Sequence, residues 1–126
     1  MDVGAVKLEA YNSFCASLPH ATHVVQWGGA LVWKVGAKVF AIAGWNEGDV
    51  LAATFKCSPL SFDLLKEQKG LRPPPYLASR GMSWIQRTSA ASMKDRALKD
   101  YLRESHRLAS LNLPKKTQRE LGLNSA

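Results

Sequence analysis

Aromatic rings and lysines recur through the segments HVVQW, ALVWKV and VLAATFKC, at residues 23–27, 30–35 and 50–57. If these are strands, alternation places Trp27, Lys34 and Lys56 on one face of a sheet. Rings stack on nucleic-acid bases, and lysine ammonium groups contact phosphates. Such a face would suit a nucleic acid. The alternative is that a loop, the C-terminal tail or a partner chain covers it.

A second unusual stretch, LRPPPYLASRGMSWIQRT, spans residues 71–88. Its proline run favours a rigid connector from a helix to the sheet edge over a ligand for another protein. Arginine can hold a phosphate in its planar fork, although each arginine could equally form an ion pair or cap carbonyl groups. The full set of candidate nucleic-acid contacts is Trp27, Lys34, Lys38, Lys56, Arg72, Arg80, Arg87, Lys115 and Lys116.

Charge supports the same class of partner. The 126 residues include 17 Lys or Arg against 10 Asp or Glu, a net charge of +7. Such a balance favours nucleic acid, an acidic protein or a membrane surface, although solubility alone could explain it. The length predicts one domain over 1–126, with a basic tail over 114–126. No segment has the length of a membrane span or the pattern of a signal peptide, so we expect a cytoplasmic protein without membrane contact.

The hydrophobic pattern predicts an α+β domain with an antiparallel sheet of about five strands and helices mainly on one face. Gly28-Gly29 and Gly36-Ala37 are typical of two-residue hairpin turns. The elements that we expect are helices at 3–18, 58–70 and 93–112, and strands at 23–27, 30–35, 38–43, 50–57 and 82–88.

Those turns determine which side chains share a face. They predict that Trp33 opposes Phe40 and that His23 opposes Lys34. The predicted core face comprises Val24, Leu31, Trp33, Val35, Phe40, Ile42, Leu51, Phe55 and Cys57. The predicted open face comprises His23, Val25, Trp27, Val32, Lys34, Val39, Ala41, Thr54 and Lys56.

The residues that could do catalysis or hold a metal are few and scattered. Cys15 and Cys57 lack metal-ligand spacing and are expected to be reduced core thiols. The histidines are dispersed, and no pattern of paired acids, a Ser-His-Asp order or a glycine-rich phosphate loop is present. We therefore expect no enzyme, no metal and no cofactor.

The order of short motifs resembles the MmcQ/YjbR family. WKVGAK at 33–38, FKCSP at 55–59, RPPPY at 72–76 and LPKK at 113–116 stand where the family has FKVGGK, LKCDP, RPAPY and LPKK. Trp33 replaces the usual phenylalanine and Ser58 the usual aspartate. The resemblance spans about residues 3–119. It implies a CyaY-like, frataxin-like fold and a double-wing DNA-binding motif, so that DNA is a more probable partner than RNA.

Three functions are compatible with this pattern. The first is a nucleic-acid-binding module, and the second is a protein-interaction or regulatory domain whose basic face meets an acidic partner. The third, iron handling by analogy with frataxin, ranks last because hard cations need clustered carboxylates and the first helix has only Asp2 and Glu9.

Overall fold

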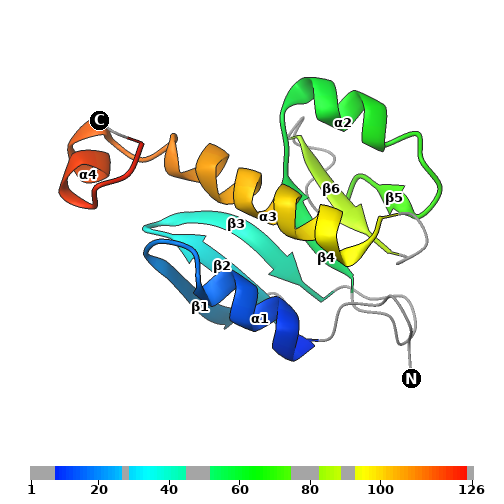
Figure 1. The fold of residues 1–126 in the computed structure, drawn as a ribbon, viewed down its shortest axis with the longest axis horizontal. Helices are drawn as coiled ribbons and strands as arrows, with labels where there is room; N and C mark the ends of the chain where they lie inside the picture. The colour runs from blue at the N-terminus through cyan, green and yellow to red at the C-terminus, as the bar shows by residue number, and fades with distance from the viewer. Residues whose placement is uncertain (1–7, 27–28, 45–51, 75–82, 89–92, 125–126) are drawn as a thin grey trace.

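A computed structural model of the chain describes residues 8–26, 29–44, 52–74, 83–88 and 93–124. Helices and strands follow one another through these residues (Figure 1). In chain order they are α1 (Leu8–Ala16), β1 (Ala21–Gln26), β2 (Ala30–Val35), β3 (Lys38–Ala43), β4 (Ala53–Lys56), α2 (Pro59–Leu65), β5 (Leu71–Arg72), β6 (Trp84–Arg87), α3 (Asp95–Ser110) and α4 (Lys115–Glu120).

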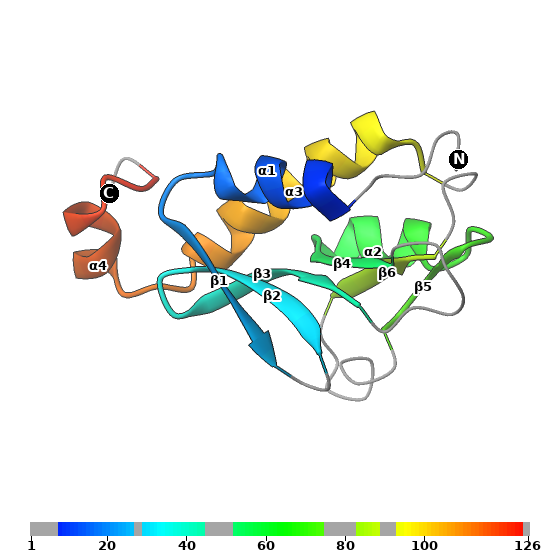
Figure 2. The same ribbon diagram turned by 90° about the horizontal axis from the view of Figure 1, so that it is seen from below.

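The strands of the described residues form one six-stranded antiparallel sheet in the order β1-β2-β3-β4-β6-β5. Helices α1, α2 and α3 lie on the same side of this sheet (Figure 2). The predicted α+β class, with an antiparallel sheet and helices mainly on one face, is therefore confirmed. The strand that the pattern missed is β5, whose two residues pair with the end of β6.

Helix α3 supplies the centre of the core. Its inward stripe includes Leu98, Leu102 and Ser105, each at most 1% exposed, as the 3.6-residue period predicts. Tyr101 on the same side stacks on Phe55 of β4, with ring centroids 5.1 Å apart. Burial of such side chains is the main contribution to stability, at about 1.5–3 kcal/mol for each large apolar group.

The first hairpin has a different register from the predicted one. Gln26 pairs with Ala30, so three residues rather than two separate the strands, and His23 opposes Trp33 instead of Lys34. The imidazole of His23 lies 4.8 Å from the Trp33 ring. Because a one-residue slip moves every side chain to the other face, the predicted faces of β1 are wrong. Val24 belongs to the face opposite the helices, beside Val32, and is 39% exposed.

The second hairpin has the predicted two-residue turn, since Val35 pairs with Lys38, but a β-bulge follows it. Trp33 opposes Ala41 rather than Phe40, which is the extra residue. Both Trp33 and Phe40 are buried as expected, at 4% and 0% exposure. An inserted residue reverses the alternation beyond it, so the predicted faces of Ala41 and Ile42 are exchanged.

The face opposite the helices is not the open surface that the pattern predicted. Ala30, Val32 and Ile42 form a small apolar cluster there, with exposures of 2%, 0% and 0%. Thr54, on the same face of β4, is also fully buried. Lys34 and Val39 on this face are half-buried, and Val24 on the edge strand is exposed.

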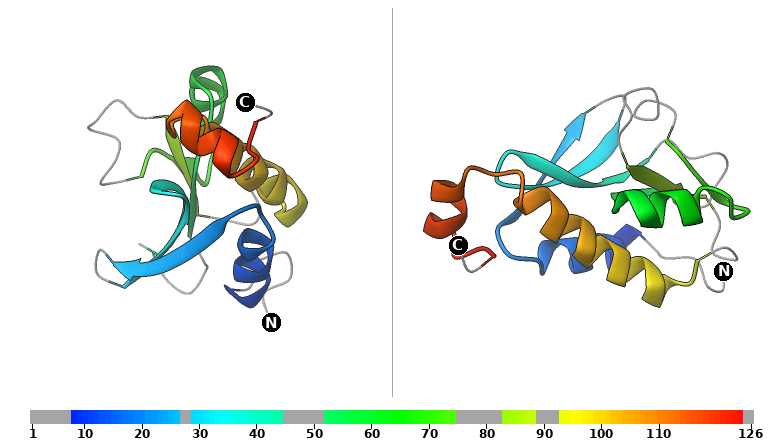
Figure 3. Two further views of the ribbon diagram at one scale, coloured as in Figure 1. Left: turned by 90° about the vertical axis from the view of Figure 1, so that its left-hand side faces the viewer. Right: turned by 90° about the horizontal axis from the view of Figure 1, so that it is seen from above.

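Two connecting segments also differ from expectation. The chain reaches the sheet edge at β5, before Pro73 and Pro74, so the proline run does not make the crossing from the helix layer. The predicted basic tail contains α4, which lies beyond the C-terminal end of α3 (Figure 3). Leu113 anchors it: at Gly36, whose φ is +57°, a Cβ atom would lie 3.0 Å from the Leu113 Cδ2. Leu113, directly before the tail, therefore packs against the β2–β3 turn.

A buried hydroxyl connects α3 to two strands at once. Ser105 Oγ donates to the Phe40 carbonyl at 2.6 Å and accepts the Lys56 backbone N–H at 2.7 Å. The β3–β4 ladder ends at the Ala41–Phe55 pair, so these two backbone groups lie just past its last rung. The hydroxyl satisfies them where the ladder no longer can.

We predict that Ser105→Ala destabilises the protein by about 2–3 kcal/mol, because it removes the partner of two backbone groups. Urea unfolding followed by circular dichroism measures this loss. Ser13→Ala is the matched control, since Ser13 is exposed on α1, and it should change the free energy of unfolding by less than about 0.5 kcal/mol. Equal midpoints for the two variants would contradict the bridging role.

The thiols generate a second prediction. Both cysteines are free and buried, as expected, and burial raises the pKa of Cys15 to about 12 and of Cys57 to about 11. Neither should react rapidly with a thiol reagent at neutral pH, because the thiolate is the reactive form. The stability that these neutral thiols contribute is complete below pH 9, their ordinary pKa, and declines as the pH rises towards 11–12.

The measurement is the labelling rate of the native protein, with Ser13→Cys as an exposed positive control. Labelling of either native cysteine at the rate of the introduced one would show that the core is open at that position.

Candidate nucleic-acid interface

The sheet divides at the end of β4 that lies nearest the β2–β3 turn. Strand β3 pairs with β4 only from Ala43–Ala53 to Ala41–Phe55. Strand β4 continues alone with β6, where Lys56 pairs with Trp84 and the Cys57 N–H donates to the Ser83 carbonyl at 2.8 Å. The β2–β3 turn therefore separates from β4 and β6, and the C-terminal part of α3 lies above the gap.

A pocket occupies this division. It has a volume of about 440 Å³, and we call it the hairpin-side pocket. Lys56 and Trp84 form one wall, Lys38 and Val39 the other, and Asn112 reaches it from the residues after α3. Ala37 and Ala109 also line it, and none of the described lining residues is acidic.

Three lysines surround Val39 and form what we call the lysine cluster: Lys34, Lys38 and Lys56. Lys34 opposes Val39 in the β2–β3 ladder, while Lys38 and Lys56 line the pocket with it. Lys38 is exposed, and the other two are half-buried. Within the described part of the chain, none of the three lies within ion-pair distance of a carboxylate. Among the described residues, no carboxylate therefore pairs with the positive charge of the cluster.

The cations on the helix side contrast with this cluster. Arg103 bonds to Asp100 at 3.0 Å, and Arg107 makes two bonds to Glu104, one of them at 2.9 Å. The bonds from Arg107 lower the pKa of the Glu104 carboxyl. These pairs at i, i+3 are typical of a solvated helix face and leave little net charge there.

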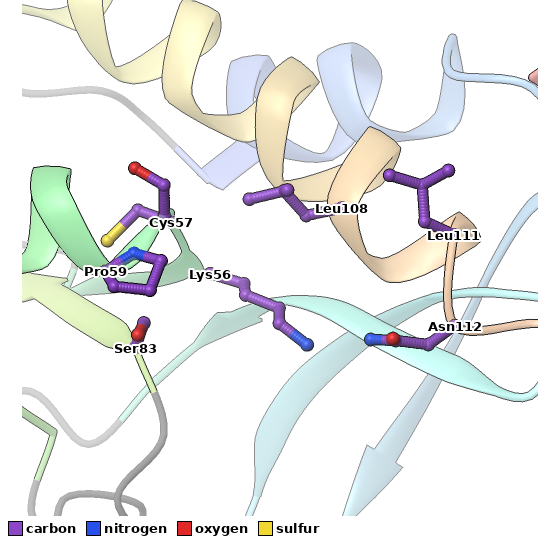
Figure 4. Close-up of a pocket in the computed structure, with 8 residues that line it drawn as sticks. Lys56, Cys57, Pro59, Ser83, Leu108, Leu111 and Asn112 are labelled. Atoms are coloured by element: carbon purple, nitrogen blue, oxygen red, sulfur yellow. The ribbon is translucent and has the colours of Figure 1, made fainter.

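A second pocket of about 400 Å³ lies on the other side of Lys56, and we call it the helix-side pocket. Lys56 and Asn112 line both pockets. Their side chains point towards each other from β4 and from the end of α3 (Figure 4). The two pockets therefore form one groove with an ammonium and an amide at its middle.

The remaining candidate residues do not join this site. Arg87 is wrong as a surface contact: it is 1% exposed on the core face, and its Nε donates to the Met93 carbonyl at 2.8 Å. Arg72 is half-buried, and its Nε donates to Gln86 Oε1 at 2.8 Å. Lys115 and Lys116 are exposed on α4. Trp27 and Arg80 lie outside the described residues.

Sequence reasoning missed two residues of the groove, Trp84 and Asn112. Trp84 is 5% exposed, and its buried indole N–H has no hydrogen-bond partner among the described residues. The pairing of β6 with β4 would have identified Trp84, but the two strands are separated by α2 and β5, and the sequence pattern does not fix their register. Asn112 follows the last turn of α3, and no pattern in the sequence marks it.

The described residues contain no cluster of three or more His, Cys, Asp or Glu side chains that could hold a metal ion. Among the helices of the same residues, none has both the length and the apolar composition of a membrane span.

Comparison with known proteins shows which family the chain belongs to. The family model described as YjbR matches residues 16–108. No curated protein matches. A solved structure, the Deinococcus radiodurans protein DR2400 with a DUF419 domain, is 22% identical to this chain and superimposes with a TM-score of 0.82. The alignment covers 99% of this chain and 94% of that one, so the two share a fold. Since the YjbR model matches most of its length, the chain belongs to the YjbR family.

Proposed function

We propose that the protein is a non-enzymatic DNA-binding module and that the lysine cluster is its contact surface. Phosphates of the backbone would meet Lys34, Lys38 and Lys56. Contacts of this kind supply affinity and position but carry no sequence information directly, so binding would be largely indifferent to sequence.

The observation that carries the proposal is that no carboxylate of the described residues pairs with this cluster. Three of the ten acidic residues, Asp63, Asp100 and Glu104, are already engaged with cations of their own helices. An anionic partner is the natural counterion for three lysines that project from one end of a sheet.

The position of the cluster on rigid elements adds to this support. Lys34 lies within a strand paired on both sides, and the Lys56 backbone is held by Ser105. Because the backbone at these lysines is already ordered, less conformational entropy is lost when they bind a partner. The resemblance of the chain to double-wing DNA-binding proteins agrees with a contact at the β2–β3 hairpin.

The compartment is a separate matter. The free thiols of the core suit the reducing cytoplasm.

We predict that binding to random duplex DNA weakens as salt rises, with a slope of log K against log salt of roughly 0.9 per neutralised phosphate. Replacing Lys34 and Lys56 together by alanine should reduce affinity for every sequence and flatten the slope by about 1–2 units. Fluorescence anisotropy over a salt series measures both quantities, and thermal melting checks that the double variant remains folded.

Two control variants distinguish the lysine cluster from the basic residues of α3 and α4. Arg103→Ala removes a cation that is already paired with Asp100, and it should leave the slope unchanged. Lys115→Ala with Lys116→Ala tests the exposed end of α4. If only that pair alters binding, α4 is the contact and the lysine cluster is not. Absence of binding at low salt to any DNA would refute the proposal and direct attention to an acidic protein partner.

A further inference from the structure

The groove on both sides of Lys56 contains more than a cluster of surface charges. Its middle is formed by the Lys56 ammonium and the Asn112 side-chain amide, which point towards each other (Figure 4). Lysine offers three N–H donors and the amide offers two, so this point can donate several hydrogen bonds to one anion. Within the part of the chain that the structure describes, neither pocket is lined by an acidic residue that would compete for these donors.

The helix-side pocket adds an apolar wall to this polar centre. Pro59, Leu108 and Leu111 line it, and Leu111 is 46% exposed at the end of α3. Ser83 adds a hydroxyl to the lining. The pocket volume of about 400 Å³ falls within the range of sites for small molecules. The groove therefore matches a ligand with an anionic head and a flat apolar body.

We propose that this groove binds a nucleotide that ends in a phosphate monoester. The phosphate lies between Lys56 and Asn112, and the base lies against Pro59, Leu108 and Leu111. A monoester carries about 1.5–2 negative charges at neutral pH, more than the single charge of a diester within a strand, so the centre favours a terminal phosphate. This inference extends the proposed function from strand contact to recognition of a strand end.

The same chemistry has two sources, a free nucleotide and the 5′-phosphorylated end of a strand. Three probes distinguish them: thymidine 5′-monophosphate, hexathymidylate with a 5′-phosphate, and hexathymidylate with a 5′-hydroxyl. Binding is measured at low salt by NMR chemical-shift changes of the Lys56 and Asn112 amides and by anisotropy of 3′-labelled oligonucleotides.

We expect the 5′-phosphorylated strand to bind about five- to tenfold more tightly than the hydroxyl form. Hydrogen bonds to a charged phosphate are stronger than bonds to a neutral hydroxyl, and screening by solvent at an exposed site limits the difference. Asn112→Asp should abolish this preference, since it puts a carboxylate beside Lys56. Asn112 is exposed, so the variant should fold normally. The matched control is Gln68→Glu, which adds the same charge at an exposed position outside both pockets.

The outcomes separate this inference from the DNA-binding function. Equal affinity for both strands, with no shifts on adding the mononucleotide, overturns the groove and leaves DNA binding intact. Binding of the mononucleotide in the groove, without binding of either strand, supports the groove with a free nucleotide as ligand and overturns the DNA-binding function. A preference that survives Asn112→Asp shows that the end is recognised elsewhere and overturns the assignment.

Discussion

The hydroxyl of Ser105 connects the elements on which the candidate site depends. It is fully buried, and it bonds to a carbonyl of β3 and an N–H of β4 beyond the point where those strands pair. Without it, each of these backbone groups would lack its partner in a low-dielectric interior, where polar groups need one. The bond allows the strands to separate under α3 without leaving orphaned groups. The separation makes room for the hairpin-side pocket, and it holds the backbone of Lys56 at the pocket wall.

The bulge in β3 works together with this bond. An extra residue at Phe40 turns both Phe40 and Ala41 towards the helices, and it bends the strand away from its neighbour. Phe40 then packs edge-on against His106 of α3, with ring centroids 5.1 Å apart. Burial lowers the pKa of that histidine, and its Nε2 bonds to the Pro19 carbonyl at 2.7 Å.

The charges are arranged in two different ways on the two sides of the molecule. On α3, Arg103 and Arg107 each pair with an acid three residues earlier, and Lys99 and Arg103 lie over the Phe14 ring. At the split end of the sheet, the cluster of three lysines has no such partners among the described residues. The net charge of +7 is therefore not spread evenly. This difference is the basis for choosing the sheet end rather than the helix face as the contact surface.

The sequence alone determined the α+β class, helices α1, α2 and α3 and most strands, since hydrophobic period and glycine turns are local properties. It also predicted the burial of Trp33, Phe40 and both cysteines, and the side of the sheet on which Lys34 and Lys56 lie. The register of β1, the bulge at Phe40 and the burial of Arg87 depended on tertiary packing, because a one-residue shift costs little locally and reverses whole faces. Only the three-dimensional structure brought Trp84 and Asn112 to Lys56, since the pairing of β4 with β6 and the end of α3 join residues far apart in the chain.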